Sequence, residues 1–186
     1  MQHELVARAQ AGDHDAFSVL ARASLPRLYA IATLILRDRD RAQDAVQEAL
    51  VLAWRHVRAL RDVEAWDAWL YRTTVRACYR HARQQKRRDL VELHVEPDPE
   101  RPGGFDLALS VAERDRLGRE LGRLPLDQRA VMVLHFYLDL PLTVAAEILE
   151  IPSGTAKSRL HRGLLALRSA MSAEPEAMAL TPERSA

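Results

Sequence analysis

The amino-acid sequence predicts an all-α protein of two small helical domains joined by a flexible acidic linker. Apolar residues recur at i, i+3, i+4 and i+7, which is the helical period, and the alternation that marks strands is missing. A segment rich in proline, glycine and acids, which cannot build a packed core, divides the chain at residues 89–112. We therefore expect domains at residues 1–88 and 113–172, followed by a disordered tail at 173–186.

The first domain is expected to contain four helices. The first covers residues 4–23 with a break at Gly12–Asp13, and the others cover residues 25–37, 40–60 and 65–87. Asp40 precedes the third apolar stripe and Gln43 follows three residues later, a pattern typical of a helix N-terminus.

The fourth predicted helix carries an unusual concentration of positive charge. Residues 69–88 hold seven basic residues and no acid, in a chain whose total formal charge is +1. Steps of four, four, three and four residues place five arginines on one arc of this helix: Arg72, Arg76, Arg80, Arg83 and Arg87. A solvated helix face is one interpretation, but such faces normally mix both signs. An arc without acids favours a polyanion as partner, since phosphate contacts release counterions.

Two tryptophans accompany the arginines. Trp69 lies on the basic side of the predicted helix and Trp66 near its edge. Aromatic rings beside arginines provide surfaces on which unpaired bases stack, at about 1–3 kcal/mol per base. The pattern thus indicates single-stranded or melted nucleic acid, with core packing as the alternative for the tryptophans.

The second domain contains a predicted helix-turn-helix. A helix begins at Pro125, a short helix follows at residues 142–149, and a third opens at Pro152–Ser153 and continues to about residue 171. Residues 151–173 carry four basic residues and no acid. The N-terminal part of such a helix enters the major groove, where its polar side chains read base edges. A plain helical bundle is the alternative, and Glu150 stands at the turn position where glycine is favoured.

Several classes of protein are excluded by what the sequence contains. Lys and Arg number 27 against 26 Asp and Glu, so the total charge indicates no partner. The single cysteine, Cys78, excludes an intramolecular disulfide and a cysteine zinc site, and is expected to be buried. The apolar run at residues 29–36 is too short to span a membrane, and no secretion signal is visible. We expect no membrane insertion, a cytoplasmic location, no cofactor or metal, and no enzymatic activity.

The two halves together resemble the extracytoplasmic-function (ECF) sigma factors of bacterial RNA polymerase. The resemblance covers about residues 4–88 and 113–171, and it implies sigma region 2 in the first domain and region 4 in the second. The matching motifs are AQDAVQEA at 42–49, AWR at 53–55, WLYR at 69–72, LP at 124–125, QRAV at 128–131 and GTAKSRLHR at 154–162.

The resemblance implies a role for each surface. Asp44, Gln47 and Glu48 match the polar face that docks on the clamp coiled coil of the polymerase β′ subunit. In the family, one helix opens the promoter −10 element and captures a flipped base. The resemblance assigns this role to the helix that carries Trp66, Trp69, Arg72, Arg76 and Arg80. Arg83 continues the basic arc of the same helix. Region 4 is expected on the β flap. The −35 element would be read by Ser153, Thr155, Lys157, Ser158, Arg159 and Arg162.

Some residues depart from the family pattern. Arg76 replaces a frequent asparagine, Arg80 a frequent aspartate, Glu150 the turn glycine and Val144 an often acidic residue. The base preference of the family at the −10 element is therefore not assigned to this chain. The base preference at the −35 element is left open.

The function predicted on these grounds is that of a sigma factor, which binds core RNA polymerase and directs promoter-specific initiation. A stand-alone helix-turn-helix regulator is the main alternative, although it leaves the polar face at Gln47–Glu48 unexplained. A helical protein-interaction module is the second alternative. The two-domain plan also motivates the hypothesis that an anti-sigma factor clamps the domains together and hides the polymerase-binding faces.

Overall fold

The computed structural model describes residues 1–91 and 111–172, with side chains described for 1–86 and 116–172. Every regular element within these ranges is helical, which confirms the predicted fold class. The predicted tail and most of the predicted linker lie outside the described residues. The helices that flank this linker reach Val91 on one side and begin at Val111 on the other, so they extend into both ends of the segment predicted as linker.

The chain begins with α1 (Gln2–Gln10) and α2 (His14–Leu36), which meet at a tight turn. Gly12 has a φ of 98°, a conformation that glycine adopts without a steric penalty. Asp13 caps α2 by accepting a hydrogen bond from the Ala16 N–H at 2.9 Å. The predicted break at Gly12–Asp13 is thereby confirmed.

Helix α2 is continuous through Pro26, so the prediction of two separate helices at 4–23 and 25–37 was wrong. A proline inside a helix removes one backbone hydrogen bond and costs about 3 kcal/mol. Leu20 before the proline and Leu28 after it are both buried in one core, at 3% and 0% exposure. Packing of the long apolar helix on both sides of Pro26 outweighs the local cost.

Helix α3 (Arg39–His56) is followed by two short 3₁₀ turns, η1 (Val57–Ala59) and η2 (Val63–Ala65), and then by α4 (Trp66–Val91). The cap of α3 is Asp38, whose carboxylate accepts from the Arg41 N–H at 2.8 Å and also pairs with the Arg41 guanidinium. The prediction of Asp40 as the cap was therefore wrong. Aspartate stands at both position 38 and position 40, and the sequence pattern did not distinguish them.

The second half of the chain contains α5 (Val111–Arg123), α6 (Leu126–Met132), the π-helical turn η3 (Val133–Tyr137), α7 (Leu142–Leu149) and α8 (Ser153–Ser172). Helices α7 and α8 form the predicted helix-turn-helix. Glu150 ends α7 in the left-handed conformation, with φ 55°.

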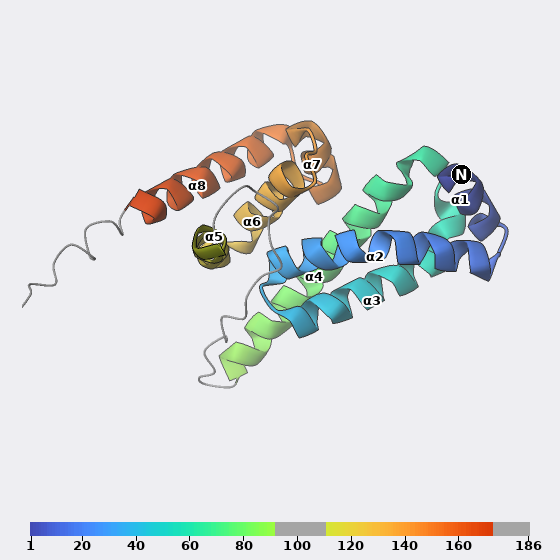
Figure 1. Ribbon diagram of the computed structural model, residues 1–186, viewed down its shortest axis with the longest axis horizontal. Coiled ribbons are helices and arrows are strands. Elements are labelled where there is room, and N and C mark those ends of the chain that lie inside the picture. Colours follow the sequence, from blue (N-terminus) through green and yellow to red (C-terminus); the bar gives the residue numbers. More distant parts are fainter. Residues whose placement is uncertain (92–110, 173–186) are drawn as a thin grey trace, which may run out of the picture.

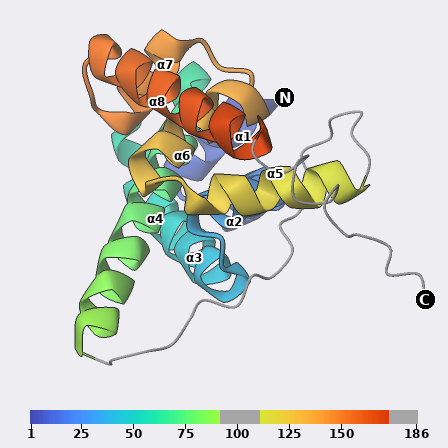
Figure 2. The ribbon, with the colours of Figure 1, turned by 90° about the vertical axis from the view of Figure 1, so that its left-hand side faces the viewer.

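The two halves pack against each other around a shared core. Helices α2, α3 and α4 lie against one another, and the second half lies across one end of this bundle (Figures 1 and 2). Helix α4 contacts α7, and α2 contacts α6 and η3. The main core joins bundle residues such as Leu28, Trp66 and Leu70 with residues of the second half: Ala130, Val133, Leu134, Ala145 and Ile148.

One edge of this junction carries two arginines, of which Arg129 is buried and Arg37 is half-buried. Arg37 ends α2 in the left-handed conformation and lies across Gly122, where an added Cβ would be 3.1 Å from its Nε. Arg129 donates from its guanidinium to the Gly122 carbonyl at 3.0 Å. Burial lowers the pKa of Arg37, and burial together with the charge of Arg37 lowers the pKa of Arg129 to about 10. Repulsion between these two like charges opposes the packing of the two halves, which the apolar contacts favour.

Among the described helices, α2 is long and apolar enough to cross a membrane by length and composition alone, and 44% of its most apolar stretch is buried inside the fold. Its buried residues, which include Leu28, Ile31 and Ile35, belong to the main core. A buried core helix satisfies the same criterion, so this finding is weak support for a membrane span.

The close approach of α8 to α6 generates a stability prediction. A Cβ added at Gly163 would lie 2.7 Å from the Met132 sulfur. Gly163→Ala should therefore lower the free energy of unfolding by about 1–3 kcal/mol, because a packed interior must shift to admit the methyl group. Urea denaturation followed by circular dichroism measures the change.

Gly154→Ala is the matched control, because nothing lies within 4 Å of a Cβ added at that position in the same helix. It should leave stability unchanged or raise it by up to about 1 kcal/mol through helix propensity. Equal stabilities of the two variants would contradict the packing argument.

Candidate functional site

Helix α4 presents a charged face and a buried face. Leu70, Tyr71 and Ala77 on the buried side belong to the main core, as predicted. Cys78 is fully buried, which raises the pKa of its thiol to about 12 and confirms its interpretation as a small core residue. On the other side, Arg76 and Arg83 are exposed and Arg72 and Arg80 are half-buried; the Arg87 side chain is outside the described residues.

The two tryptophans at the start of α4 have different surroundings. Trp66 is 1% exposed, and its ring meets Phe17 edge-on at 6.2 Å between centroids. The structure therefore places Trp66 in the core rather than on the DNA-facing side, because its ring fills the space between α2 and α4. Trp69 is half-buried and stacks at a tilt on Trp66, with centroids 5.6 Å apart.

A small pocket of about 280 Å³ opens beside Trp69, between α3 and α4. Thr73, whose hydroxyl donates to the Trp69 carbonyl at 2.9 Å, forms part of its wall. The remaining lining residues are Leu52, His56, Arg76 and Arg80. One aromatic face and several donors from arginines thus surround the same space.

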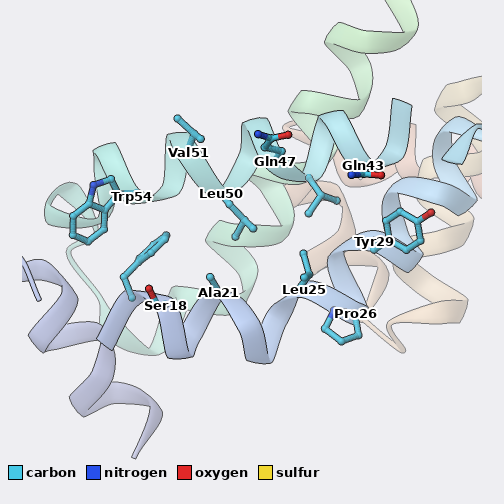
Figure 3. A pocket seen from close by; sticks show the side chains of 12 residues that line it. Ser18, Ala21, Leu25, Pro26, Tyr29, Gln43, Gln47, Leu50, Val51 and Trp54 are labelled. Atoms are coloured by element: carbon cyan, nitrogen blue, oxygen red, sulfur yellow. The ribbon is translucent and has the colours of Figure 1, made fainter. Parts of the chain in front are cut away.

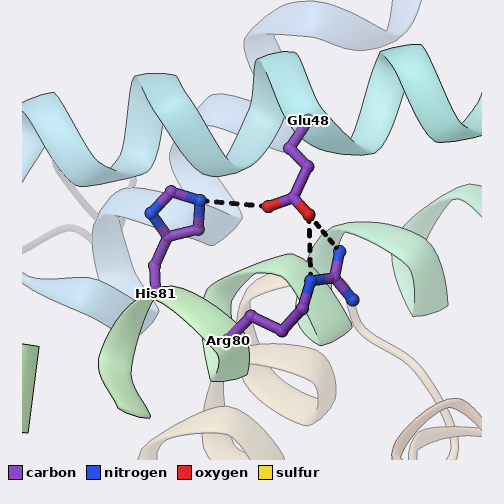
Figure 4. A network of polar contacts seen from close by, with 3 residues as sticks. All are labelled: Glu48, Arg80 and His81. Carbon is purple, nitrogen blue, oxygen red and sulfur yellow. Dashed lines mark hydrogen bonds and ion pairs between the residues drawn. The ribbon is translucent and has the colours of Figure 1, made fainter. Parts of the chain in front are cut away.

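Glu48 faces α4 rather than standing free on α3. Its carboxylate accepts from the Arg80 guanidinium at 2.9 Å and contacts the His81 Nε2 at 3.1 Å (Figure 4). Its side chain is 38% exposed. Glu48 therefore links the helix predicted to bind polymerase with the basic arc predicted to bind DNA.

Asp44 and Gln47 are exposed on α3, and Gln47 borders a long apolar groove (Figure 3). The groove runs between α2 and α3 and has a volume of about 800 Å³. Its floor and walls are mostly apolar, and two glutamines lie along one side. The lining residues are Phe17, Ser18, Ala21, Leu25, Pro26, Tyr29, Gln43, Val46, Gln47, Leu50, Val51 and Trp54.

Sequence reasoning missed this groove because two successive helices form it jointly, and helical periodicity does not specify how they pack against each other. The sequence did contain a signal for the groove, namely apolar residues of α2 and α3 that lie outside the stripes predicted to form the core. Leu25 and Val51 are each 45% exposed and Tyr29 is 37% exposed. Contiguous exposed apolar residues of this kind mark interaction sites.

The predicted upstream-DNA residues divide between two faces of α8. Ser153, Lys157 and Arg162 are exposed, while Thr155 and Ser158 are half-buried and joined by a hydrogen bond from the Ser158 hydroxyl to the Thr155 carbonyl at 2.9 Å. Arg159 lies at the flank of this surface, where its guanidinium pairs with Asp127 at 2.7 Å.

The fold brings the two predicted DNA-binding surfaces together, which the sequence did not predict. Arg76 of α4 forms an ion pair with Glu150 at the turn before α8. Tyr79 of α4 donates a hydrogen bond to Asp127, the same carboxylate that holds Arg159. Burial, with a contribution from Asp127, raises the pKa of Tyr79.

No group of three or more His, Cys, Asp or Glu side chains among the described residues is placed to hold a metal ion.

Comparison with known proteins identifies the two halves. Residues 20–88 match the family model described as Sigma-70 region 2, and residues 114–167 match Sigma-70 region 4. The chain is 34% identical over 160 residues to the ECF RNA polymerase sigma factor SigM of Mycobacterium tuberculosis, covering 86% of this chain and 79% of the relative. It is 26% identical over 177 residues to the ECF RNA polymerase sigma factor SigW of Bacillus subtilis, covering 88% and 92%.

Two solved structures share the fold. CnrH, in complex with the cytosolic domain of CnrY, aligns with a TM-score of 0.68 at 21% identity over 93% of this chain and 98% of that one. The sigma factor RpoE, in complex with the anti-sigma factor NepR from Bartonella quintana, aligns with a TM-score of 0.66 at 24% identity over 85% and 98%.

The fold and both family matches define a sigma factor of the sigma-70 type, with region 2 in the first half and region 4 in the second. The chain belongs to the ECF RNA polymerase sigma factors. It directs promoter-specific transcription, and the stand-alone regulator is not favoured.

Proposed function

We propose that the groove between α2 and α3 is the surface that binds core RNA polymerase, through the β′ clamp coiled coil. The observation that carries this proposal is the groove itself: about 800 Å³, apolar, and bordered by Gln43 and Gln47. A helical partner binds such a groove through apolar anchors spaced by helical turns. Asp44 and Gln47 then act at its polar side, as the sequence suggested, while Glu48 acts indirectly by holding Arg80 and His81.

The DNA-binding surfaces in this proposal are two separate helices. The exposed N-terminal part of α8 enters the major groove of the −35 element, where Lys157 reaches base edges. The basic arc of α4 binds the melted −10 strand, with Trp69 as a stacking surface and Arg72, Arg76, Arg80 and Arg83 as phosphate or base contacts. Trp66 supports Trp69 from the core instead of contacting DNA.

The proposed role is non-enzymatic. Promoter opening needs no bond-breaking by this chain if it binds the open state more tightly than the closed state. Acting on polymerase and the chromosome, the chain would work in the cytoplasm. The remaining predicted contact is between region 4 and the β flap, for which the exposed Phe136, Leu164 and Leu165 offer apolar surface.

An anti-sigma factor is a further proposed partner. Of the two similar structures, one is CnrH in complex with the cytosolic domain of CnrY, and the other is RpoE in complex with the anti-sigma factor NepR. This likeness supports, for the present chain, a regulator that binds the region 2 and region 4 surfaces.

Run-off transcription tests the central proposal. Purified chain and sigma-free bacterial core polymerase are combined on a pool of genomic promoter fragments. Specific transcripts are expected only when both proteins are present. Tight binding of duplex promoters by the chain alone, without transcripts in the complete mixture, would contradict it.

A substitution in the groove tests polymerase binding. Val51→Asp places a charge on the apolar groove wall and should weaken core polymerase binding by about 2 kcal/mol or more, since a buried charge without a partner is costly. Fluorescence titration of labelled chain with core polymerase measures the affinity.

The matched control is Val19→Asp, because Val19 is also 45% exposed and lies outside this groove. It should leave the affinity unchanged. Equal loss in the two variants would show that the groove is not the docking surface.

A substitution in α8 tests upstream recognition. Lys157→Ala should weaken binding of the holoenzyme to a −35-containing fragment by about 1–3 kcal/mol, the value typical of a base-edge contact. Arg168→Ala is the control, since Arg168 is an exposed basic residue near the C-terminal end of the same helix, away from the residues predicted to contact DNA. Competition binding with and without the −35 element distinguishes loss of specificity from loss of charge, and equal effects would contradict the assignment.

A further inference from the structure

Two arginines form part of the wall of the pocket beside Trp69. Arg76 and Arg80 are one helical turn apart on α4, and both line this pocket of about 280 Å³ between α3 and α4. A guanidinium group donates hydrogen bonds and cannot accept them. The ring of Trp69 lines the same space. A flat group that enters the pocket therefore meets a ring on one part of the wall and donors on another.

The guanidinium of Arg80 is held in place by the neighbouring helix. Its Nε donates to one carboxylate oxygen of Glu48 at 2.9 Å, and its Nη2 lies 2.9 Å from the same oxygen (Figure 4). The other oxygen of Glu48 contacts the His81 Nε2 at 3.1 Å, so both oxygens of this carboxylate are engaged by α4. Nη1 of Arg80 takes no part in these contacts, and its two N–H groups can donate to another acceptor.

The hydroxyl of Thr73 gives the pocket wall an acceptor. It donates its hydrogen to the Trp69 carbonyl at 2.9 Å, so its oxygen accepts from any group inside the pocket. The remaining lining side chains are the half-buried Leu52 and the exposed His56. The wall thus combines an aromatic ring, guanidinium donors and a hydroxyl acceptor.

We propose that this pocket selects guanine from the melted DNA strand, with Arg80 as the residue that determines the specificity and Glu48 as the residue that positions Arg80. The inference rests on the proposed function, because it assumes that the basic arc of α4 binds melted DNA. Guanine places two acceptors, O6 and N7, side by side, and arginine or lysine is their commonest specific partner. Its amino group is a donor, which suits the hydroxyl of Thr73.

Adenine is less suited to the same wall. Beside its N7 acceptor it carries the N6 amino group, which donates. That donor would face a guanidinium, which has no acceptor to offer. The family frequently has asparagine and aspartate, whose side-chain oxygens accept, at positions 76 and 80, and this chain has arginine at both. Acceptors are thereby exchanged for donors at this wall.

Arg80 carries the selection more than Arg76 does. The side chain of Arg76 is 55% exposed and forms an ion pair with Glu150 of the second half. Arg80 is half-buried, and its partner Glu48 belongs to the same bundle. A donor whose direction is fixed before binding loses less freedom when it binds a base. Glu48 therefore serves DNA recognition through Arg80.

Binding of single-stranded DNA by the holoenzyme tests the selection. The probes are fluorescein-labelled thymidine oligonucleotides that carry either one central guanine or one central adenine, and core polymerase alone gives the background anisotropy. A lone purine among thymidines reaches the pocket by sliding of the strand, so no promoter sequence has to be known. The wild-type holoenzyme should bind the guanine strand at least about fivefold more tightly than the adenine strand, the lower limit for one good base contact.

Arg80→Gln tests the assignment to Arg80. It replaces the guanidinium by an amide, which has both a donor and an acceptor and pairs well with adenine, so the ratio of guanine to adenine affinity should fall to one or below. Arg83→Gln is the matched control, because Arg83 is an exposed arginine of the same arc that does not line this pocket. It removes the same charge and should weaken both strands equally. Equal ratios in the two variants would overturn the assignment.

Glu48→Gln tests the positioning without altering the arginine. It keeps the size of the side chain and removes the charge that holds the guanidinium, so the ratio of guanine to adenine affinity should fall about two- to fivefold, the range expected for loss of an exposed ion pair. A purely structural role would weaken the binding of both strands alike and leave the ratio unchanged. An unchanged ratio would therefore overturn the role given to Glu48.

The outcomes separate the selection of guanine from the proposed function. Equal affinity of the wild-type holoenzyme for the two strands would overturn the selection, while binding of both strands above the background would still support a melted-DNA surface on this chain. Failure of the chain to support run-off transcription with core polymerase would remove the proposed function and this inference with it.

Discussion

The packing of α4 against α2 and α3 is the contact on which the other features of this molecule depend. Trp66 and Leu70 anchor the start of α4 in the main core, and this fixes the rotation of the whole helix about its axis. Because the buried side is fixed, the arginines are held on the opposite side and face α3 and the helix-turn-helix. A helix free to rotate would neither keep Arg80 against Glu48 nor present a continuous basic surface.

The charge of α4 is balanced from outside the helix. Its basic arc contains no acid of its own, and neighbouring elements supply the carboxylates: Glu48 from α3 and Glu150 from the turn before α8. These two partners differ in consequence. Glu48 belongs to the same bundle as Arg80, whereas Glu150 contacts Arg76 across the junction of the two halves. The helix thus has one charge partner within its own bundle and one in the other half of the chain.

The groove proposed to bind polymerase and the surfaces proposed to bind DNA lie on different elements. The groove is built by α2 and α3, and its apolar residues Leu25 and Val51 are exposed. In the proposed function, recognition of polymerase and recognition of DNA therefore use separate surfaces of the molecule.

The sequence alone was sufficient for the all-α class, the helix-turn-helix, the basic arc and the burial of Cys78, because each follows from helical periodicity within one segment. Neighbouring residues also explain its errors: Asp38 and Asp40 are both plausible caps, and Pro26 suggested an end to a helix that the core instead kept continuous. The apolar groove, the burial of Trp66 and the Arg76–Glu150 contact were decided by tertiary structure. Each depends on how separate helices approach one another, and helical periodicity specifies only which side of a helix is apolar, never which partner covers it.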